Sequence, residues 1–126
     1  MTFQTYLVED SKVIRENLVD FLEDVADAKV VASSSTENEA VAWLQSNPDL
    51  WDLALVDLFL AEGNGLAVVN ACRHRRRAQK VVVLSNYATA EMRGRAAQLG
   101  ADAFFDKSSQ LEELVAYCEE LALQPR

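Results

Sequence analysis

The five residues Leu53-Ala-Leu-Val-Asp57 decide how this chain folds. Four consecutive apolar residues predict a short strand that is buried on both faces, because a half-buried strand would alternate apolar and polar side chains. The carboxylate of Asp57 follows this run directly. A charged group in that position belongs at the edge of a sheet, where the strand leaves the core.

Four other short apolar runs lie on either side of this one, and each precedes a helical pattern. These runs are Phe3–Val8, Lys29–Ser33, Val81–Leu84 and Ala103–Phe105. Regular alternation of strand and helix predicts a parallel sheet with helices on both faces. With right-handed crossovers, five such units favour an α/β, three-layer, flavodoxin-like (βα)5 fold with strand order 2-1-3-4-5. The whole chain, residues 1–126, is expected to form one domain.

Helix-boundary signals follow the same order along the chain. Capping boxes predict helix starts at Thr36–Glu39 and Ser109–Glu112. The basic stretch Arg73–Arg77 is expected to end the third helix, where cations complement the helix dipole. The expected helices span Lys12–Val25, from Thr36 to before Asn47-Pro48, from Asn64-Gly65 to Arg73–Arg77, Thr89–Leu99 before Gly100, and the segment from Ser109 onward.

The net charge and the lengths of the apolar runs argue against two classes of function. The net charge of −8 argues against direct nucleic-acid binding, which needs a basic face, and no apolar run approaches the length of a membrane span. A cytoplasmic location is expected. Cys72 and Cys118 occupy apolar helix positions, so we interpret them as small core residues. Arg73–Arg77 is interpreted as a solvated charge run.

The polar residues at four strand ends predict a functional site. Glu9-Asp10, Asp57, Ser85 and Lys107 each stand at the exit of an expected strand. The carboxyl ends of parallel strands meet at one edge, so these side chains should gather there. Clustered carboxylates favour a hard divalent cation such as Mg²⁺. Asp57 could then attack a phosphoryl donor and form an acyl phosphate, with the cation and Lys107 neutralising charge and Ser85 donating a hydrogen bond.

Each residue alone has an ordinary structural explanation. Asp10 or Ser11 could cap the first helix, Asp57 could be a strand-end residue in a turn, and Lys107 could be a solvated loop lysine. The four positions together, in order at four strand ends, favour the functional interpretation.

This set resembles the response regulator receiver domains of two-component signalling, over nearly the whole chain. The resemblance implies Asp57 as phosphoacceptor, Asp10 as direct Mg²⁺ ligand and Glu9 as a ligand acting mainly through water. It further implies four residue roles: the backbone carbonyl of Phe59 completes the metal contacts, Ser85 and Lys107 bind the phosphoryl group, Gly65 is the glycine eight residues after the phosphoacceptor, and Phe104 is the switch aromatic.

The family's two-state mechanism implies how a signal is read out. Phosphorylation draws Ser85 inward and lets Phe104 rotate inward, which changes the surface made by residues 89–99, 103–105 and the helix from 109. Phe104 has no hydroxyl, so its switching is expected to depend on packing alone; plain core is the alternative. Phe59 and Tyr87 stand where the family tunes dephosphorylation, and we expect two rings to slow hydrolysis.

Three positions depart from the family pattern. Glu9 replaces the usual aspartate, Ala61 stands where a proline is common, and Ser108 replaces the proline that often follows the lysine. A cis bond before serine would cost about 3 kcal/mol, so the Lys107–Ser108 peptide is expected to be trans.

The resemblance implies a histidine kinase or histidine phosphotransfer protein as donor and a downstream protein as partner. We expect a stand-alone regulator, acting by docking or as a phosphoryl shuttle, that is not an enzyme beyond its own phosphorylation and dephosphorylation. A phosphorylation-dependent homodimer is left open. No direct contact with nucleic acid or membrane is expected.

Three alternative classes require residues or properties that differ from those of this chain. A haloacid-dehalogenase-type phosphatase needs an Asp-x-Asp pattern after the first strand, which Glu9-Asp10-Ser11 lacks. A flavodoxin needs a hydroxyl- and glycine-rich loop there. A degenerate, phosphorylation-independent receiver is disfavoured by the intact set of site residues.

Overall fold

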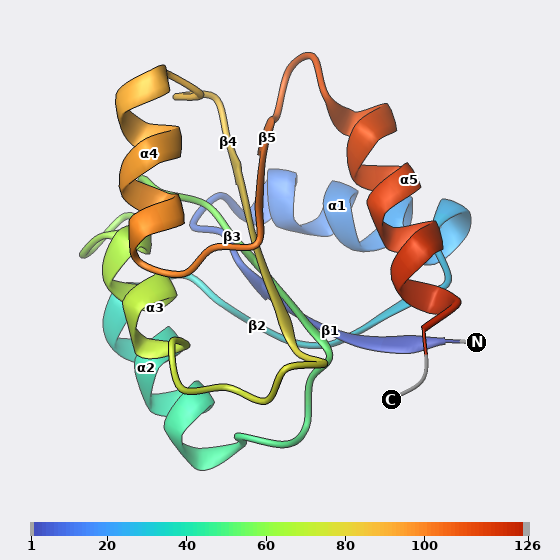
Figure 1. Ribbon diagram of the computed structural model, residues 1–126, viewed down its shortest axis with the longest axis horizontal. Coiled ribbons are helices and arrows are strands. Elements are labelled where there is room, and N and C mark those ends of the chain that lie inside the picture. Colours follow the sequence, from blue (N-terminus) through green and yellow to red (C-terminus); the bar gives the residue numbers. More distant parts are fainter. Residues whose placement is uncertain (1, 125–126) are drawn as a thin grey trace.

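Five parallel strands form one sheet in the computed structural model, which describes residues 2–124 (Figure 1). The neighbours pair in the order β2-β1-β3-β4-β5, which confirms the predicted flavodoxin-like arrangement. Each strand begins and ends within one residue of its predicted limits. The strands are β1 (Phe3–Val8), β2 (Ala28–Ser34), β3 (Leu53–Val56), β4 (Lys80–Ser85) and β5 (Ala103–Asp106).

Helices cover both faces of this sheet. In Figure 1, α1 and α5 lie on one face, and α2, α3 and α4 lie on the other. Within residues 2–124, none of the helices combines the length and the apolar character needed to cross a bilayer. The helices are α1 (Lys12–Val25), α2 (Glu37–Ser46), α3 (Gly65–Ala71), α4 (Ala90–Gln98) and α5 (Leu111–Ala122).

The core consists of two apolar layers, one on each side of the sheet. In β3, Ala54 and Val56 face the layer under α2, α3 and α4, whereas Leu53 and Leu55 face the layer under α1 and α5. Each large side chain buried this way contributes about 1.5–3 kcal/mol of transfer free energy. Cys72 lies in the first layer and Cys118 in the second, both as free thiols, so their interpretation as core residues is confirmed. Burial raises their pKa to about 11 and about 12.

Of the two predicted capping boxes, the one at α2 forms in part and the one at α5 does not form. The Thr36 hydroxyl accepts a bond from the Glu39 amide at 3.2 Å, as expected for the start of α2. The Glu39 carboxylate accepts from the Ser35 amide at 3.0 Å, one residue before the cap, so only half of the box forms as predicted. At α5 the prediction was wrong, because the N-cap is Gln110, without a side-chain cap bond, rather than Ser109.

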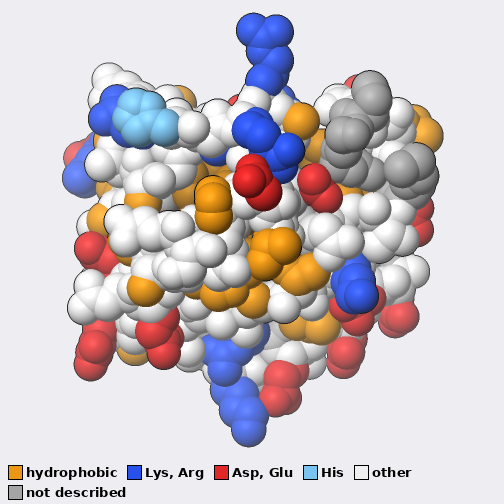
Figure 2. All heavy atoms as spheres, turned by 90° about the horizontal axis from the view of Figure 1, so that it is seen from below, with side chains coloured by type: hydrophobic (Ala, Val, Ile, Leu, Met, Phe, Trp, Pro, Cys, Tyr) orange, Lys and Arg blue, Asp and Glu red, His pale blue; other side chains and the backbone are white. Residues whose placement is uncertain are grey.

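The basic stretch was also misplaced. Helix α3 ends at Ala71, before the arginines begin. Arg75 is not solvated: its guanidinium bonds the Gln79 carbonyl at 3.0 Å, the Gly100 carbonyl at 2.7 Å and the Asp102 carboxylate at 2.7 Å. These contacts tie the α3–β4 and α4–β5 connections together. Figure 2 looks onto the amino ends of the strands, where basic and acidic side chains are interspersed around exposed apolar ones.

Candidate functional site

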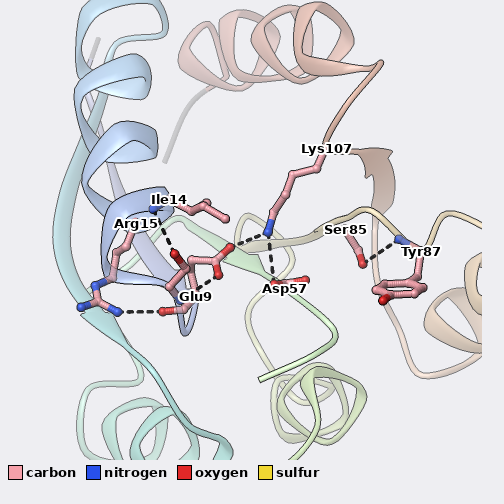
Figure 3. A network of polar contacts seen from close by, with 8 residues as sticks. Glu9, Ile14, Arg15, Asp57, Ser85, Tyr87 and Lys107 are labelled. Carbon is pink, nitrogen blue, oxygen red and sulfur yellow. Dashed lines mark hydrogen bonds and ion pairs between the residues drawn. The ribbon is translucent and has the colours of Figure 1, made fainter. Parts of the chain in front are cut away.

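All the predicted strand-end residues lie at the carboxyl edge of the sheet. Glu9 and Asp10 follow β1, Asp57 follows β3, Ser85 is the last residue of β4, and Lys107 follows β5. The register of β1, β3 and β4 brings the ends of these strands level with one another. Figure 3 shows the Lys107 side chain reaching down between Glu9 and Asp57, with Ser85 on the other side of Asp57. The chain therefore brings the cluster together as predicted.

Lys107 bridges two of the carboxylates. Its ammonium lies 2.6 Å from Oε1 of Glu9 and 3.2 Å from Oδ2 of Asp57. The three side chains are nearly buried, with exposed fractions of 12% for Lys107, 2% for Glu9 and 11% for Asp57. A charge removed from water this far requires an opposite charge beside it. The ion pairs therefore hold the lysine in the centre of the site.

The titration behaviour of Glu9 and Lys107 reflects this burial. Burial raises the pKa of Glu9 above its usual value of 4.5, against the opposing hydrogen bonds from Lys107 and from the Ser11 amide. For Lys107, burial alone would lower the pKa, but Glu9 and Asp57 outweigh it and raise the pKa above 10.5. The ammonium thus stays charged at neutral pH.

The acidic residues fit a divalent cation. One carboxylate oxygen from each of Glu9, Asp10 and Asp57 lies within 4.8 Å of the others. Three carboxylates face one lysine, which leaves an excess of negative charge in a largely buried place. Oxygen ligands and uncompensated negative charge are what Mg²⁺ requires from a protein site. The donor set therefore suits the ion predicted from the sequence.

Each of the three residues in the loop after β1 has a different place in the structure. The Ser11 hydroxyl accepts from the Ile14 amide at 3.3 Å and caps α1, so Asp10 is not needed as the cap. The Ser11 amide donates to Oε2 of Glu9 at 3.1 Å, and Arg15 donates to the Glu9 carbonyl at 2.8 Å (Figure 3). These bonds fix Glu9 toward Lys107 and leave Asp10, half-exposed, beside the cluster.

Ser85 is buried, and its hydroxyl oxygen accepts from the Tyr87 amide at 3.1 Å. The hydroxyl proton remains available as a donor. The Tyr87 and Phe59 rings contact each other, with centroids 4.2 Å apart and planes tilted by 50°. Both are about half exposed, at 56% and 51%. Two large, half-exposed aromatic side chains therefore follow β3 and β4 at the carboxyl edge of the sheet.

Gly65 is required by a close approach of two backbones. A Cβ atom at this position would lie 2.0 Å from the carbonyl oxygen of Asp57 and 2.7 Å from Cα of Leu58. The Gly65 amide donates to the Leu58 carbonyl at 2.9 Å. Helix α3 thus begins directly against the backbone of Asp57 and Leu58. Ala61 lies in the intervening loop, which an antiparallel bridge between Phe59 and Asn64 closes.

The turn after β5 presents Lys107 without the family's usual proline. Peptide bonds in the described part of the chain are trans, so the expectation for Lys107–Ser108 is confirmed. The Asp106 carboxylate accepts from the amide of Ser108 at 2.8 Å and from its hydroxyl at 2.7 Å. Those bonds lower the pKa of Asp106. Side-chain hydrogen bonds therefore shape this turn.

Sequence reasoning missed the surroundings of Phe104. This residue is half-buried on β5, and the guanidinium carbon of Arg93 lies 5.1 Å from its ring centroid. A cation therefore faces the ring in addition to the packing that the sequence predicts, while the switching role of Phe104 stays a prediction. An arginine in the middle of a helix carries no sequence signal for this contact.

Comparison with known proteins gives consistent matches. The family profile described as the response regulator receiver domain matches residues 6–119. The chain is 31% identical over 108 residues to the transcriptional regulatory protein CiaR of Streptococcus pneumoniae, covering 86% of the chain and 46% of CiaR. It is 32% identical over 108 residues to the photosynthetic apparatus regulatory protein RegA of Cereibacter sphaeroides, covering 86% and 56%. The chain thus spans about half the length of the curated relatives it matches.

Solved structures give the same fold. A LuxR-family two-component response regulator from Aurantimonas sp. SI85-9A1 superposes with a TM-score of 0.84 at 25% identity, covering 97% of this chain and 86% of that one. The BeF3-activated N-terminal receiver domain of RstA from Klebsiella pneumoniae superposes with a TM-score of 0.81 at 19% identity, covering 96% and 99%. At that identity the second match shows the fold alone.

Proposed function

The chain belongs to the response regulator receiver domain family of two-component signalling, and from this premise we propose that Asp57 accepts a phosphoryl group in a Mg²⁺-dependent reaction. The donor would be a phosphohistidine on a histidine kinase or a histidine phosphotransfer protein. The observation that carries the proposal is the Lys107 ammonium, which lies 3.2 Å from the Asp57 carboxylate inside a cluster of three acids.

The transfer follows from the position of each group. A carboxylate oxygen of Asp57 forms a bond to phosphorus while the bond from phosphorus to the donor histidine nitrogen breaks, giving an acyl phosphate and a free imidazole. Lys107, held by Glu9, donates to a phosphoryl oxygen and offsets its charge. Ser85 has a free hydroxyl proton for a second phosphoryl oxygen. Mg²⁺ held by Asp10, Asp57 and the Phe59 carbonyl, with Glu9 nearby, would supply further positive charge.

Negative charge at the site explains why the metal is needed. Without a cation, an incoming phosphoryl group would meet Glu9, Asp10 and Asp57 together, and Lys107 alone would oppose them. Clustered like charges disfavour the approach of another anion. Phosphoryl acceptance should therefore fail when Mg²⁺ is removed.

The direct test is incubation with acetyl phosphate and Mg²⁺, followed by intact mass measurement. Wild-type protein should gain one phosphoryl group, and Asp57→Asn should gain none. Asp20→Asn, which changes an exposed aspartate on α1, is the matched control and should behave as wild type. A folded wild-type protein that gains no mass in Mg²⁺ would refute the proposal and favour a phosphorylation-independent receiver.

We further propose that the Phe59 and Tyr87 rings slow hydrolysis of the acyl phosphate. The rings are 4.2 Å apart, about half exposed, and two residues after Asp57 and Ser85, so we expect them to hinder the approach of water to the phosphorus atom. Phe59→Ala and Tyr87→Ala should each shorten the lifetime of radiolabelled phosphoprotein several-fold. Val13→Ala, at another exposed apolar residue beside the loop after β1, is the control. A lifetime of seconds that neither substitution alters would rule out this role.

As a receiver, the chain would act through another protein rather than turn over a separate substrate, in the cytoplasm where its donor resides. Phosphorylation would change the surface of α4, β5 and α5 for a downstream partner or a second copy of the chain. A change in self-association on phosphorylation, measured by sedimentation, distinguishes these two partners. The net charge of −8 gives no support to direct nucleic-acid binding.

A further inference from the structure

Arg93 joins three separate segments near the phosphoacceptor edge. Its Nε donates to the Ala88 carbonyl in the β4–α4 connection at 3.2 Å, and Nη1 donates to the Phe104 carbonyl in β5 at 2.9 Å. Its Nη2 donates to Oε1 of Gln110 at 2.7 Å, just before α5. One side chain of α4 therefore contacts both neighbours of α4 in the expected output surface.

The Gln110 side chain extends this network to the turn that carries Lys107. The same Gln110 oxygen accepts from the Asp106 amide at 2.8 Å, and the Gln110 amide donates to the Asp106 carbonyl at 2.9 Å. Arg93 thus holds a turn whose middle residue reaches Asp57. This also explains why Gln110 makes no cap bond to α5, since its oxygen is already occupied.

The contact of Arg93 with the Phe104 ring differs from its three hydrogen bonds. The hydrogen bonds go to backbone carbonyls and to Gln110, and none of them depends on the Phe104 side-chain rotamer. The guanidinium lies 5.1 Å from the ring centroid, which is within the range of a cation–π interaction. Rotation of the ring into the core would remove it from the cation and leave the other bonds intact.

We propose that Arg93 is a positioning residue that holds the Phe104 ring in its resting place and so sets how readily the protein adopts its phosphate-bound arrangement. The inference deepens the proposed function and rests on it. Inward movement of Phe104 gives up the cation–π contact, so the resting arrangement is favoured by the strength of that contact. Loss of the cation should therefore move the population toward the inward arrangement.

The size of the effect follows from the strength of such contacts at half-buried positions. A cation–π interaction of this kind corresponds to a population change of about two- to five-fold. A ligand that binds only the arrangement with Phe104 turned inward has an apparent affinity proportional to the population of that arrangement. When the resting arrangement predominates, the apparent affinity should therefore rise by the same factor as that population.

Beryllofluoride, titrated in the presence of Mg²⁺, is a suitable probe because it mimics a phosphoryl group without covalent turnover. Isothermal titration should show that Arg93→Met binds it about two- to five-fold more tightly than wild type. Arg93→Lys keeps the charge but not the planar fork, and should fall between the two. Arg95→Met, at an exposed arginine on the same helix, should match wild type.

A double-mutant cycle with Phe104→Leu isolates the ring contact from a general loosening of the structure. Leucine keeps an apolar side chain but has no aromatic face, so Arg93→Met should no longer tighten binding in that background. Equal tightening in both backgrounds, or no tightening in folded Arg93→Met and Arg93→Lys, would overturn the inference. Wild-type protein that fails to bind beryllofluoride at all would refute the proposed function and this inference with it.

Discussion

Replacement of Lys107 by methionine tests whether this lysine stabilises the folded protein by compensating the buried charges of Glu9 and Asp57. Methionine keeps an unbranched apolar side chain but removes the ammonium that lies 2.6 Å from Glu9 and 3.2 Å from Asp57. Loss of one partner from a buried ion pair costs about 3–5 kcal/mol, because the remaining charge stays buried without compensation. Lys107 and Asp57 still keep 12% and 11% of their side-chain surface exposed, so we expect the lower end, about 3 kcal/mol.

The assay is urea unfolding at neutral pH without divalent cations. Lys12→Met is the matched control: it removes the same group from an exposed pair, in which Lys12 and Glu16 are 4.0 Å apart and 79% and 65% exposed. Exposed pairs of this kind change stability by less than about 1 kcal/mol. If Lys107→Met were as mild as Lys12→Met, the carboxylates would not depend on the lysine and the electrostatic reasoning would be wrong.

Mg²⁺ and pH provide two further readouts of the same variant. Mg²⁺ should stabilise Lys107→Met more than wild type, because the cation enters a cluster that has lost its ammonium. The raised pKa of Glu9 favours the folded state fully below about pH 4.5, and this contribution is lost as the pH rises through the raised value. Without Lys107 that pKa should rise further, so the deficit of the variant should shrink as the pH falls from 7 toward 5.

Four other substitutions test the packing and the helix ends of the fold. Gly65→Ala should destabilise the protein by about 2 kcal/mol or more and reduce phosphoryl acceptance, because its Cβ would lie 2.0 Å from the Asp57 carbonyl oxygen. Gly94→Ala has open space around its Cβ and should instead stabilise α4 by about 0.5–1 kcal/mol. Thermal unfolding measures both changes. Thr5→Val should raise the free energy of unfolding by about 1 kcal/mol, since the buried Thr5 hydroxyl has no partner within the described residues; a loss would mean that the hydroxyl is satisfied. Thr36→Ala should cost about 1 kcal/mol in urea unfolding by removing the cap of α2, and no loss would show that the cap bond is dispensable.

The sheet and the site edge were predictable because their signals are local in the sequence. A strand buried on both faces must be a continuous apolar run, and the run ends where the chain leaves the core. A polar residue at that point, such as Asp57 or Ser85, therefore marks the sheet edge directly. The cap residue Thr36 was predictable for the same reason, since its hydroxyl accepts from an amide only three residues later.

The contacts that sequence reasoning missed are made by long side chains to distant partners. Arg75 bonds carbonyls of Cys72, Gln79 and Gly100, and Arg93 bonds the Phe104 carbonyl. Every residue carries a backbone carbonyl, so no residue type marks which carbonyl an arginine will reach. The sequence therefore predicted that Arg73–Arg77 would be solvated, although Arg75 connects the segments that precede β4 and β5.

The turn after β5 is held by several side-chain hydrogen bonds in this chain rather than by a proline after Lys107. A proline after Lys107 would restrict the backbone by itself. Here Ser108 bonds Asp106, and Gln110 bonds both Asp106 and Arg93, so the lysine is placed by side chains that belong to β5, α4 and the approach to α5. The placement of Lys107 is thereby connected to α4. In this chain, Arg93 and Gln110 connect α4 to the turn that carries the ammonium, a connection that a proline turn alone would not provide.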